Sequence, residues 1–279
     1  MKKISRRSFL AAAGLSVAAL ALTACGGSSA STASSVASSA ASSEAASTSA
    51  AAGELTTVEA GKLTMATNAA FPPYEMTTDA GDFEGIDIET AQAIADKLGL
   101  ELQIDDMDFD AALLSVQQGK ADIVMAGVTV TDERKAVMDF SDSYATGIQS
   151  IIVPEGSDIA SPDDLADKKI GTQRGTTGYI YCSDDFGDEN VVAYDDGLTA
   201  VQALNNGQVD AVVIDNAPAQ EFVAANPGLK ILDTSYAEED YAIGMAKNSP
   251  LEDAVNSALE ELKADGTLQA IVDKYITAE

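Results

Sequence analysis

One nine-residue stretch carries the residue types that could bind an anion. Residues 126–134, AGVTVTDER, follow an apolar run and alternate small and hydroxyl side chains before a predicted helix start. Thr131 suits the N-cap of that helix, which places Arg134 in the first turn. Helix N-termini favour anions, so a ligand carboxylate shared by backbone N–H groups and the guanidinium would explain an arginine there. A surface arginine at a helix start is the alternative interpretation.

Two later segments could complete a ligand site. Residues 175–178, GTTG, follow a predicted strand and precede a predicted helix, which is typical of an anion-accepting helix N-terminus. No Lys-Ser/Thr pair follows at P-loop spacing. Asp215 ends the apolar run 209–214, and open α/β sheets bind ligands at the carboxyl ends of their strands. Alternatively, Asp215 only caps the helix that begins near Ala217.

The elements that position these residues alternate along the chain. Strands are predicted over residues 62–67, 100–104, 121–125, 148–153, 169–172, 191–194, 209–214, 230–232 and 241–245. Predicted helices lie between most of them, one of them ending at Gly99, and two more close the chain at residues 250–263 and 267–275. Residues 68–76 are expected to form a loop and residues 138–144 an irregular segment. This alternation predicts an α/β fold with mostly parallel sheets.

The N-terminus has the features of an export signal. Four basic residues precede the apolar run 9–22, and Leu-Thr-Ala-Cys at 22–25 resembles a bacterial lipobox. We therefore expect residues 1–24 to be a lipoprotein signal peptide and Cys25 to be acylated. Residues 5–10, SRRSFL, also resemble a twin-arginine signal, and the two export routes are not separated. Residues 25–57 are rich in Ser and Ala and predict a disordered tether.

Composition excludes several classes of function. The net charge of −29 argues against nucleic-acid binding. Without the four basic residues of the signal, 12 basic and 45 acidic residues would leave −33. Histidine is absent, which removes the commonest general base and zinc ligand. With Cys25 acylated, Cys182 has no disulfide partner. We expect no catalytic residue, no metal and no cofactor.

The motifs, taken in order, resemble a known family. The chain resembles the extracytoplasmic solute-binding proteins of ABC importers, family 3, the polar amino-acid group, of the Gram-positive lipoprotein type. The segments that carry the resemblance are ATNAAFPPY (66–74), GIDI (85–88), MDF (107–109), AGVTVTDER (126–134), DFS (139–141), GTTG (175–178) and DAVVID (210–215). The resemblance implies a two-lobed, type II periplasmic-binding-protein-like α/β fold with two crossing hinge strands. Lobe 1 would comprise residues 58–147 plus 242–279, and lobe 2 residues 148–241.

The resemblance also implies how each end of an amino acid is held. Arg134 would clamp the α-carboxylate, helped by Thr177 and by backbone N–H groups near Thr129 and Thr176. The α-ammonium would meet Asp215. Each charge needs such a partner because a closing cleft removes its water.

The remaining implied contacts surround the ammonium and the side chain. The Gly127 carbonyl and the Thr129 hydroxyl would also accept from the α-ammonium, and Phe71 and Phe109 would flank the side chain. Asn68 stands where basic-amino-acid and glutamine binders of the family carry an acid. Gln173 stands where the glutamine binder has a lysine.

The neutral pair of Asn68 and Gln173 predicts a polar, uncharged ligand side chain. Glu75 and Arg174 lie nearby in the sequence and could reverse that prediction. The expected function is a monomeric, lipid-anchored receptor on the extracytoplasmic face of the cell membrane, which delivers a free amino acid to the transmembrane subunits of an ABC permease. The alternatives are a cyclohexadienyl or arogenate dehydratase-like enzyme on the same fold, which the absence of histidine disfavours, and a ligand-sensing receptor lobe.

Overall fold

The first lobe is built on a five-stranded sheet. The computed structural model describes residues 55–276, and in it the strand order of this sheet is β5-β1-β6-β14-β7. Its strands are β1 (Lys62–Thr67), β5 (Glu101–Asp106), β6 (Ile123–Val124), β7 (Met138–Phe140) and β14 (Gly244–Ala246). A small sheet adds β2 (Ala70–Phe71), β3 (Glu75–Thr77) and β4 (Phe83–Glu84). We call this part lobe 1.

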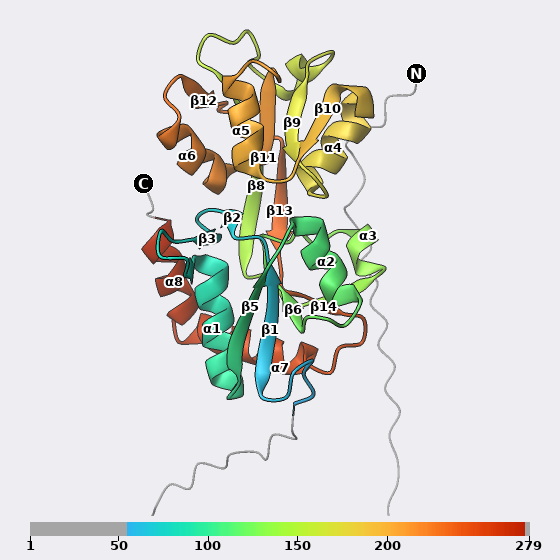
Figure 1. Ribbon diagram of the computed structural model, residues 1–279, viewed down its shortest axis with the longest axis vertical. Helices are drawn as coiled ribbons and strands as arrows, with labels where there is room; N and C mark the ends of the chain where they lie inside the picture. The colour runs from blue at the N-terminus through green and yellow to red at the C-terminus, as the bar shows by residue number, and fades with distance from the viewer. Residues whose placement is uncertain (1–54, 277–279) are drawn as a thin grey trace, which may run out of the picture. The chain divides into compact units, whose positions relative to one another are not determined.

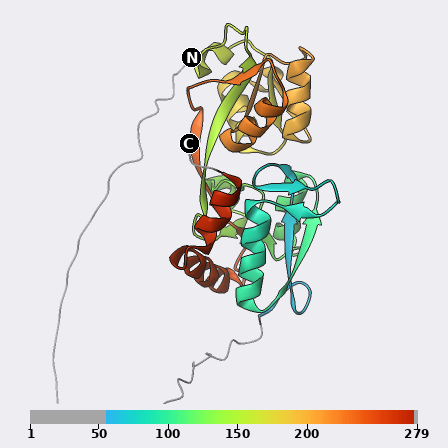
Figure 2. The same ribbon diagram turned by 90° about the vertical axis from the view of Figure 1, so that its left-hand side faces the viewer.

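Five helices belong to lobe 1. They are α1 (Ile86–Leu98), α2 (Phe109–Gln117), α3 (Asp132–Lys135), α7 (Glu252–Ala264) and α8 (Thr267–Tyr275). Helices α1, α7 and α8 pack against one another (Figure 2). Helix α1 contributes Ile88, Ala91 and Ile94, which recur at helical spacing and are buried. It ends at Gly99, whose φ of 70° suits a glycine C-cap.

The second lobe is built on a six-stranded sheet. Its main path is β10-β9-β11-β8-β12, and β13 pairs with β8. The strands are β8 (Ala145–Pro154), β9 (Ile170–Gln173), β10 (Val191–Tyr194), β11 (Ala211–Asp215), β12 (Leu229–Ile231) and β13 (Ala237–Tyr241). The helices are α4 (Thr177–Phe186), α5 (Gly197–Asn205), α6 (Asn216–Ala225) and the 3₁₀ turns η1 (Pro162–Leu165) and η2 (Asp188–Asn190). We call this part lobe 2.

Two strands carry the chain between the lobes. The chain passes from β7 into β8 and from β13 into β14, and β8 and β13 lie antiparallel, with Gly147 opposite Glu239 (Figure 1). The predicted two-lobed α/β fold with two crossing strands is therefore confirmed. The residue limits assigned to each lobe stay a prediction. No helix within residues 55–276 is long and apolar enough to cross a bilayer.

The prediction of mostly parallel sheets is wrong. The two large sheets contain four parallel pairings and five antiparallel ones. The antiparallel pairings all involve β8 or β14. Strand β8 carries the chain out of lobe 1, and β14 brings it back, so each runs antiparallel to its neighbours in the sheet. The strands joined by helices run parallel.

Three local predictions need correction. The strand predicted over 241–245 is two strands, β13 and β14, which belong to different sheets. Ala242 and Ile243 between them are fully buried, so the apolar run shows no break in the sequence. The expected loop 68–76 contains β2 and the start of β3, and the irregular segment 138–144 contains β7. The strands β2, β3 and β7 are only two or three residues long, which is too short for periodicity to reveal them.

Gly147 on β8 leaves room for a buried tyrosine, and an alanine there should destabilise the fold. A Cβ at this position would lie 2.4 Å from Cζ and 2.5 Å from the hydroxyl of Tyr241, a side chain that is 1% exposed. We expect Gly147→Ala to lower the free energy of unfolding by about 1–3 kcal/mol, measured by urea denaturation. Gly156→Ala is the control because nothing lies within 4 Å of its Cβ position. Equal effects of the two substitutions would contradict the tight contact.

Candidate functional site

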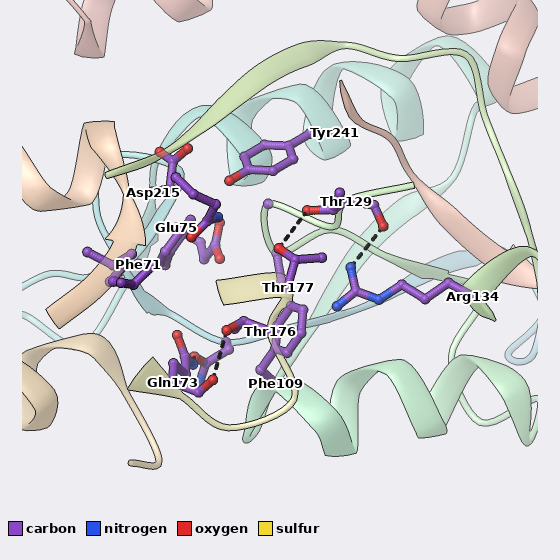
Figure 3. Close-up of a pocket in the computed structure, with 16 residues that line it drawn as sticks. Phe71, Glu75, Phe109, Thr129, Arg134, Gln173, Thr176, Thr177, Asp215 and Tyr241 are labelled. Atoms are coloured by element: carbon purple, nitrogen blue, oxygen red, sulfur yellow. Dashed lines mark hydrogen bonds between the residues drawn. The ribbon is translucent and has the colours of Figure 1, made fainter. Parts of the chain in front are cut away.

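A cavity is lined by residues from both lobes, and all ten predicted ligand-binding residues line it (Figure 3). These residues are Asn68, Phe71, Phe109, Gly127, Thr129, Arg134, Gln173, Thr176, Thr177 and Asp215. The lining also includes Glu75, Ala126, Gln149, Val213, Ile214 and Tyr241. The segments picked out by their chemistry are therefore brought together in space, although their ligand contacts stay a prediction.

Arg134 is buried beside this cavity. Its backbone N–H donates to the Thr131 hydroxyl at 3.2 Å, so Thr131 is the N-cap of α3 as predicted. Its side chain is 8% exposed, which rules out the surface-arginine interpretation. Nη1 donates to the Thr129 carbonyl at 2.8 Å and Nη2 to the Gly175 carbonyl at 3.1 Å. Burial lowers the pKa of Arg134 from its ordinary value. Two of five N–H donors are used, which leaves three for an anion.

The first turn of α4 adds donors to this part of the cavity. Thr176 is its N-cap, with a hydroxyl that accepts from the Tyr179 N–H at 3.3 Å and donates to the Gln173 carbonyl at 2.8 Å. Thr177, the first helical residue, is buried. N–H groups in a first turn have no intrahelical acceptor, so they can donate to an anion together with Arg134.

Asp215 caps α6, as one of its two interpretations predicts, and it also lies at the cavity, where its ligand contact stays a prediction. One oxygen caps α6 by accepting from the Ala217 N–H at 3.0 Å, and the other accepts from the Ile148 N–H at 2.7 Å. The side chain is 1% exposed and also lines the cavity. Burial raises the pKa of Asp215 to about 6, and a cation placed beside it would favour the ionised form.

Asn68 and Gln173, the predicted pair of neutral residues, form a direct hydrogen bond between the lobes. Gln173 Nε2 donates to Asn68 Oδ1 at 2.8 Å and to the Asp195 carbonyl at 3.3 Å. Asn68 Nδ2 donates to the Met107 carbonyl at 2.9 Å. Both amide protons of Gln173 are thereby used, so its Oε1 atom is left as an acceptor.

The aromatic rings of Phe71, Phe109 and Tyr241 contribute apolar surface to the cavity. Phe71 stacks on Tyr74 with ring centroids 5.7 Å apart, and Tyr74 meets Tyr241 edge to face at 5.4 Å. Gly127 has φ of 54°, and a Cβ on it would lie 2.9 Å from the Phe71 ring. Phe109 lies under the Arg134 guanidinium, 5.4 Å from ring centroid to Cζ. A side chain between Phe71 and Phe109 would be enclosed by apolar surface.

Glu75 is the unexpected acid of the cavity. It is fully buried, and neither carboxylate oxygen has a hydrogen-bond partner among the described residues. Burial raises the pKa of Glu75 well above its usual range, and the nearby Asp87 charge adds to the effect. Buried acceptors are rarely left without donors, so Glu75 either holds a proton that it can donate to Asp87 or meets a donor from outside the chain.

Comparison with known proteins identifies the family. The model of the bacterial extracellular solute-binding proteins, family 3, matches residues 63–278. The chain belongs to this family. It is 33% identical to the L-cystine-binding protein TcyJ of Escherichia coli K12 over 226 residues, which covers 79% of this chain and 85% of TcyJ. Its relatives are named as amino-acid-binding proteins, and one of them is named as an ABC transporter arginine-binding protein.

Solved structures of other members superpose on this solute-binding protein. The arginine-, lysine-, histidine-binding protein ArtJ of Geobacillus stearothermophilus gives a TM-score of 0.75 at 34% identity, covering 78% of this chain and 96% of ArtJ. An ancestral arginine-binding protein bound to glutamine gives 0.75 at 42% identity, covering 78% and 99%.

Two acids of this solute-binding protein were not assigned to the site from the sequence. The sequence indicates Glu75 only as a neighbour that could change the specificity, and it gives Glu239 no role in the site. Glu239 is 6% exposed and alternates with exposed residues along β13, on the same face as Tyr241. That alternation was the available signal for an inward-facing acid. Cys25 and the signal peptide lie outside the described residues.

Asp87 binds the backbone of the site residue Gly127, and its negative charge should lower the free energy of unfolding at neutral pH. Its Oδ2 accepts from the Gly127 N–H at 3.0 Å and from the Tyr144 hydroxyl at 2.8 Å, while Oδ1 has no partner in the described chain. Burial raises the pKa of Asp87 to about 6 from 3.8. The folded state therefore holds the proton more tightly, and the stability that this group contributes falls as pH rises through 6.

Asp87→Asn should stabilise the protein, because an amide oxygen keeps both bonds and the amide nitrogen can donate to Glu75. We expect the free energy of unfolding to rise by about 1–3 kcal/mol at pH 7, with the gain shrinking toward pH 4, in urea titrations. Asp122→Asn is the matched control. Both Asp122 oxygens accept from backbone N–H groups, of Val58 and Thr64, so this change should destabilise. A gain for Asp87→Asn that does not vary with pH would contradict the argument.

Proposed function

We propose that this chain is the substrate-binding subunit of an amino-acid ABC importer and that its ligand carries a cationic side chain. The observation that carries the proposal is the charge of the cavity lining, which contains one cation, Arg134, and two acids, Asp215 and Glu75. An amino acid brings one carboxylate and one ammonium, so a neutral side chain would leave one acid without a partner.

The two ends of the ligand account for the first two charges. The α-carboxylate would face the three remaining donors of Arg134 and the first turn of α4, and the α-ammonium would face Asp215. Arg134 belongs to lobe 1, whereas α4 and Asp215 belong to lobe 2. A ligand that contacts both lobes favours the closed arrangement over an open one.

The side chain would then meet acceptors. In Figure 3, Glu75 and Gln173 lie across the cavity from Arg134. Glu75 offers two oxygens without partners, and Gln173 offers Oε1. Phe71 and Phe109 would enclose the aliphatic part of the side chain. This arrangement suits a guanidinium or ammonium group at the end of an aliphatic chain.

The relatives support a basic ligand and also define the alternative. ArtJ is named for arginine, lysine and histidine, whereas TcyJ is named for cystine and the ancestral protein was solved with glutamine. An uncharged polar side chain, as predicted from Asn68 and Gln173, would require Glu75 to keep its proton. A raised pKa of Glu75 is compatible with that alternative.

Delivery and anchoring complete the proposal. We infer that the protein is held by a lipid on Cys25, that residues 25–57 act as a tether, and that the closed receptor delivers its ligand to permease subunits as a monomer. Calorimetric titration of the purified chain with the standard amino acids tests the function. We expect the tightest binding for arginine or lysine. The absence of binding by any amino acid would contradict the proposal.

Arg134 should contribute most to affinity. We expect Arg134→Ala to cost about 3–5 kcal/mol of binding free energy for arginine, because the desolvated α-carboxylate would lose its counter-ion. The control is Arg174→Ala. The Arg174 side chain is 53% exposed and does not line the cavity, so its loss should change binding by less than about 0.5 kcal/mol. Near-normal affinity of Arg134→Ala would remove Arg134 from the site.

Glu75 should decide between charged and neutral ligands. We expect Glu75→Gln to weaken arginine binding by about 2–4 kcal/mol and to leave glutamine binding nearly unchanged, because only the cation loses a counter-charge. Calorimetric affinities of both ligands for both proteins give the comparison. If the two ligands lose affinity equally, Glu75 does not read the charge of the side chain, and the uncharged alternative is favoured.

A further inference from the structure

Glu239 joins both lobes at the back of the cavity. Its Oε2 atom accepts three hydrogen bonds, from Thr129 Oγ1 at 2.9 Å, Thr177 Oγ1 at 3.0 Å and Gln149 Nε2 at 3.0 Å. Thr129 belongs to lobe 1, Thr177 to α4 of lobe 2 and Gln149 to β8. Glu239 itself lies on β13 and is 6% exposed, with Oε1 buried.

These bonds favour one direction for two hydroxyl protons. The Thr129 and Thr177 hydroxyls also lie within hydrogen-bond distance of each other, but their bonds to Glu239 are shorter, at 2.9 and 3.0 Å. A threonine hydroxyl has one proton to donate and two lone pairs to accept with. When both protons point to Glu239, Thr129 and Thr177 can offer only lone pairs to the cavity that they line. The two hydroxyl oxygens lie 3.4 Å apart, so both can approach one ligand group (Figure 3).

Lone pairs suit an ammonium group and repel a carboxylate. We propose that Glu239 is a positioning residue that holds the Thr129 and Thr177 hydroxyls as acceptors for the ligand α-ammonium, so that the carboxylate is bound by Arg134 and backbone N–H groups alone. This assignment moves Thr177 from the anion side, where the family resemblance placed it, to the cation side. It rests on the proposed function in needing an amino acid as the ligand.

The acceptor and the negative charge of Glu239 can be separated by substitution. Glu239→Gln removes the charge but keeps an amide oxygen that can accept the same three bonds. Glu239→Met keeps a similar length but removes the acceptor, so the hydroxyl protons are free to turn toward the cavity. A positioning role predicts a loss in the methionine variant and rescue by glutamine.

The experiment compares three ligands that share a guanidinium. These ligands are L-arginine, 5-guanidinopentanoate, which lacks the α-ammonium, and agmatine, which lacks the α-carboxylate. Their dissociation constants are measured by calorimetry for wild type, Glu239→Gln and Glu239→Met. We expect the preference for arginine over 5-guanidinopentanoate to fall at least tenfold in Glu239→Met and to stay within about threefold of wild type in Glu239→Gln. The preference for arginine over agmatine should not fall in either variant.

Other outcomes overturn the inference. If Glu239→Met weakens the binding of all three ligands equally, Glu239 has a packing role. If the preference for arginine over 5-guanidinopentanoate falls equally in both variants, only the charge of Glu239 matters. If Glu239→Met does not fold, judged by circular dichroism, Thr177→Val and Thr177→Ser replace it. The valine variant should lose ammonium preference and the serine variant should keep it, and no difference between them would overturn the assignment.

Failure of the proposed function gives a different result. If wild type does not bind arginine but binds another amino acid, the cationic specificity is wrong. The same test is then made with that amino acid and its deaminated analogue. Glu239 would still be expected to control the preference for the ammonium group, so a preference unchanged in Glu239→Met would overturn the positioning role alone.

Discussion

The buried guanidinium of Arg134 is the constraint on which the site depends. Among the described residues it contacts two carbonyls and the Phe109 ring but forms no ion pair. A buried cation is costly without an anion, so the surrounding structure must hold it in place. The Thr129 carbonyl holds the guanidinium from lobe 1, and the Gly175 carbonyl holds it from lobe 2. The position of the anion half of the cavity therefore depends on how the lobes meet.

The crossing strands determine how the two lobes meet. Pairing of β8 with β13 places Gly147 against Glu239, and the missing side chain of Gly147 makes room for Tyr241. Tyr241 lines the cavity, and Glu239 lies behind it with bonds to both lobes. The segment that joins the lobes is thus also part of the binding surface. A change in the angle between the lobes must alter the contacts available to a ligand.

Sequence reasoning identified the parts of the site that depend on local signals. Arg134 behind its Thr131 cap, the first turn of α4 and the end of β11 follow from capping residues and strand ends, and each of these places a residue at the cavity. Glu75 and Glu239 could not be assigned in that way. Their surroundings come from segments distant in the chain, such as Asp87 beside Glu75, and only the fold brings them together. The sequence also did not reveal that β13 ends before β14 begins, because the residues between the two strands are buried and apolar as well.

The bond between Gln173 and Asn68 bears on ligand length. It joins the lobes across the cavity from Arg134, where the end of a ligand side chain would lie (Figure 3). A wall made by one lobe would reject long molecules at entry. A wall made by two lobes exists only when the lobes are closed, so an oversized molecule could occupy the cleft and keep the lobes from closing fully. Such a molecule would compete for the receptor without completing its closure, and size selection would then act on the closing step rather than on the first encounter.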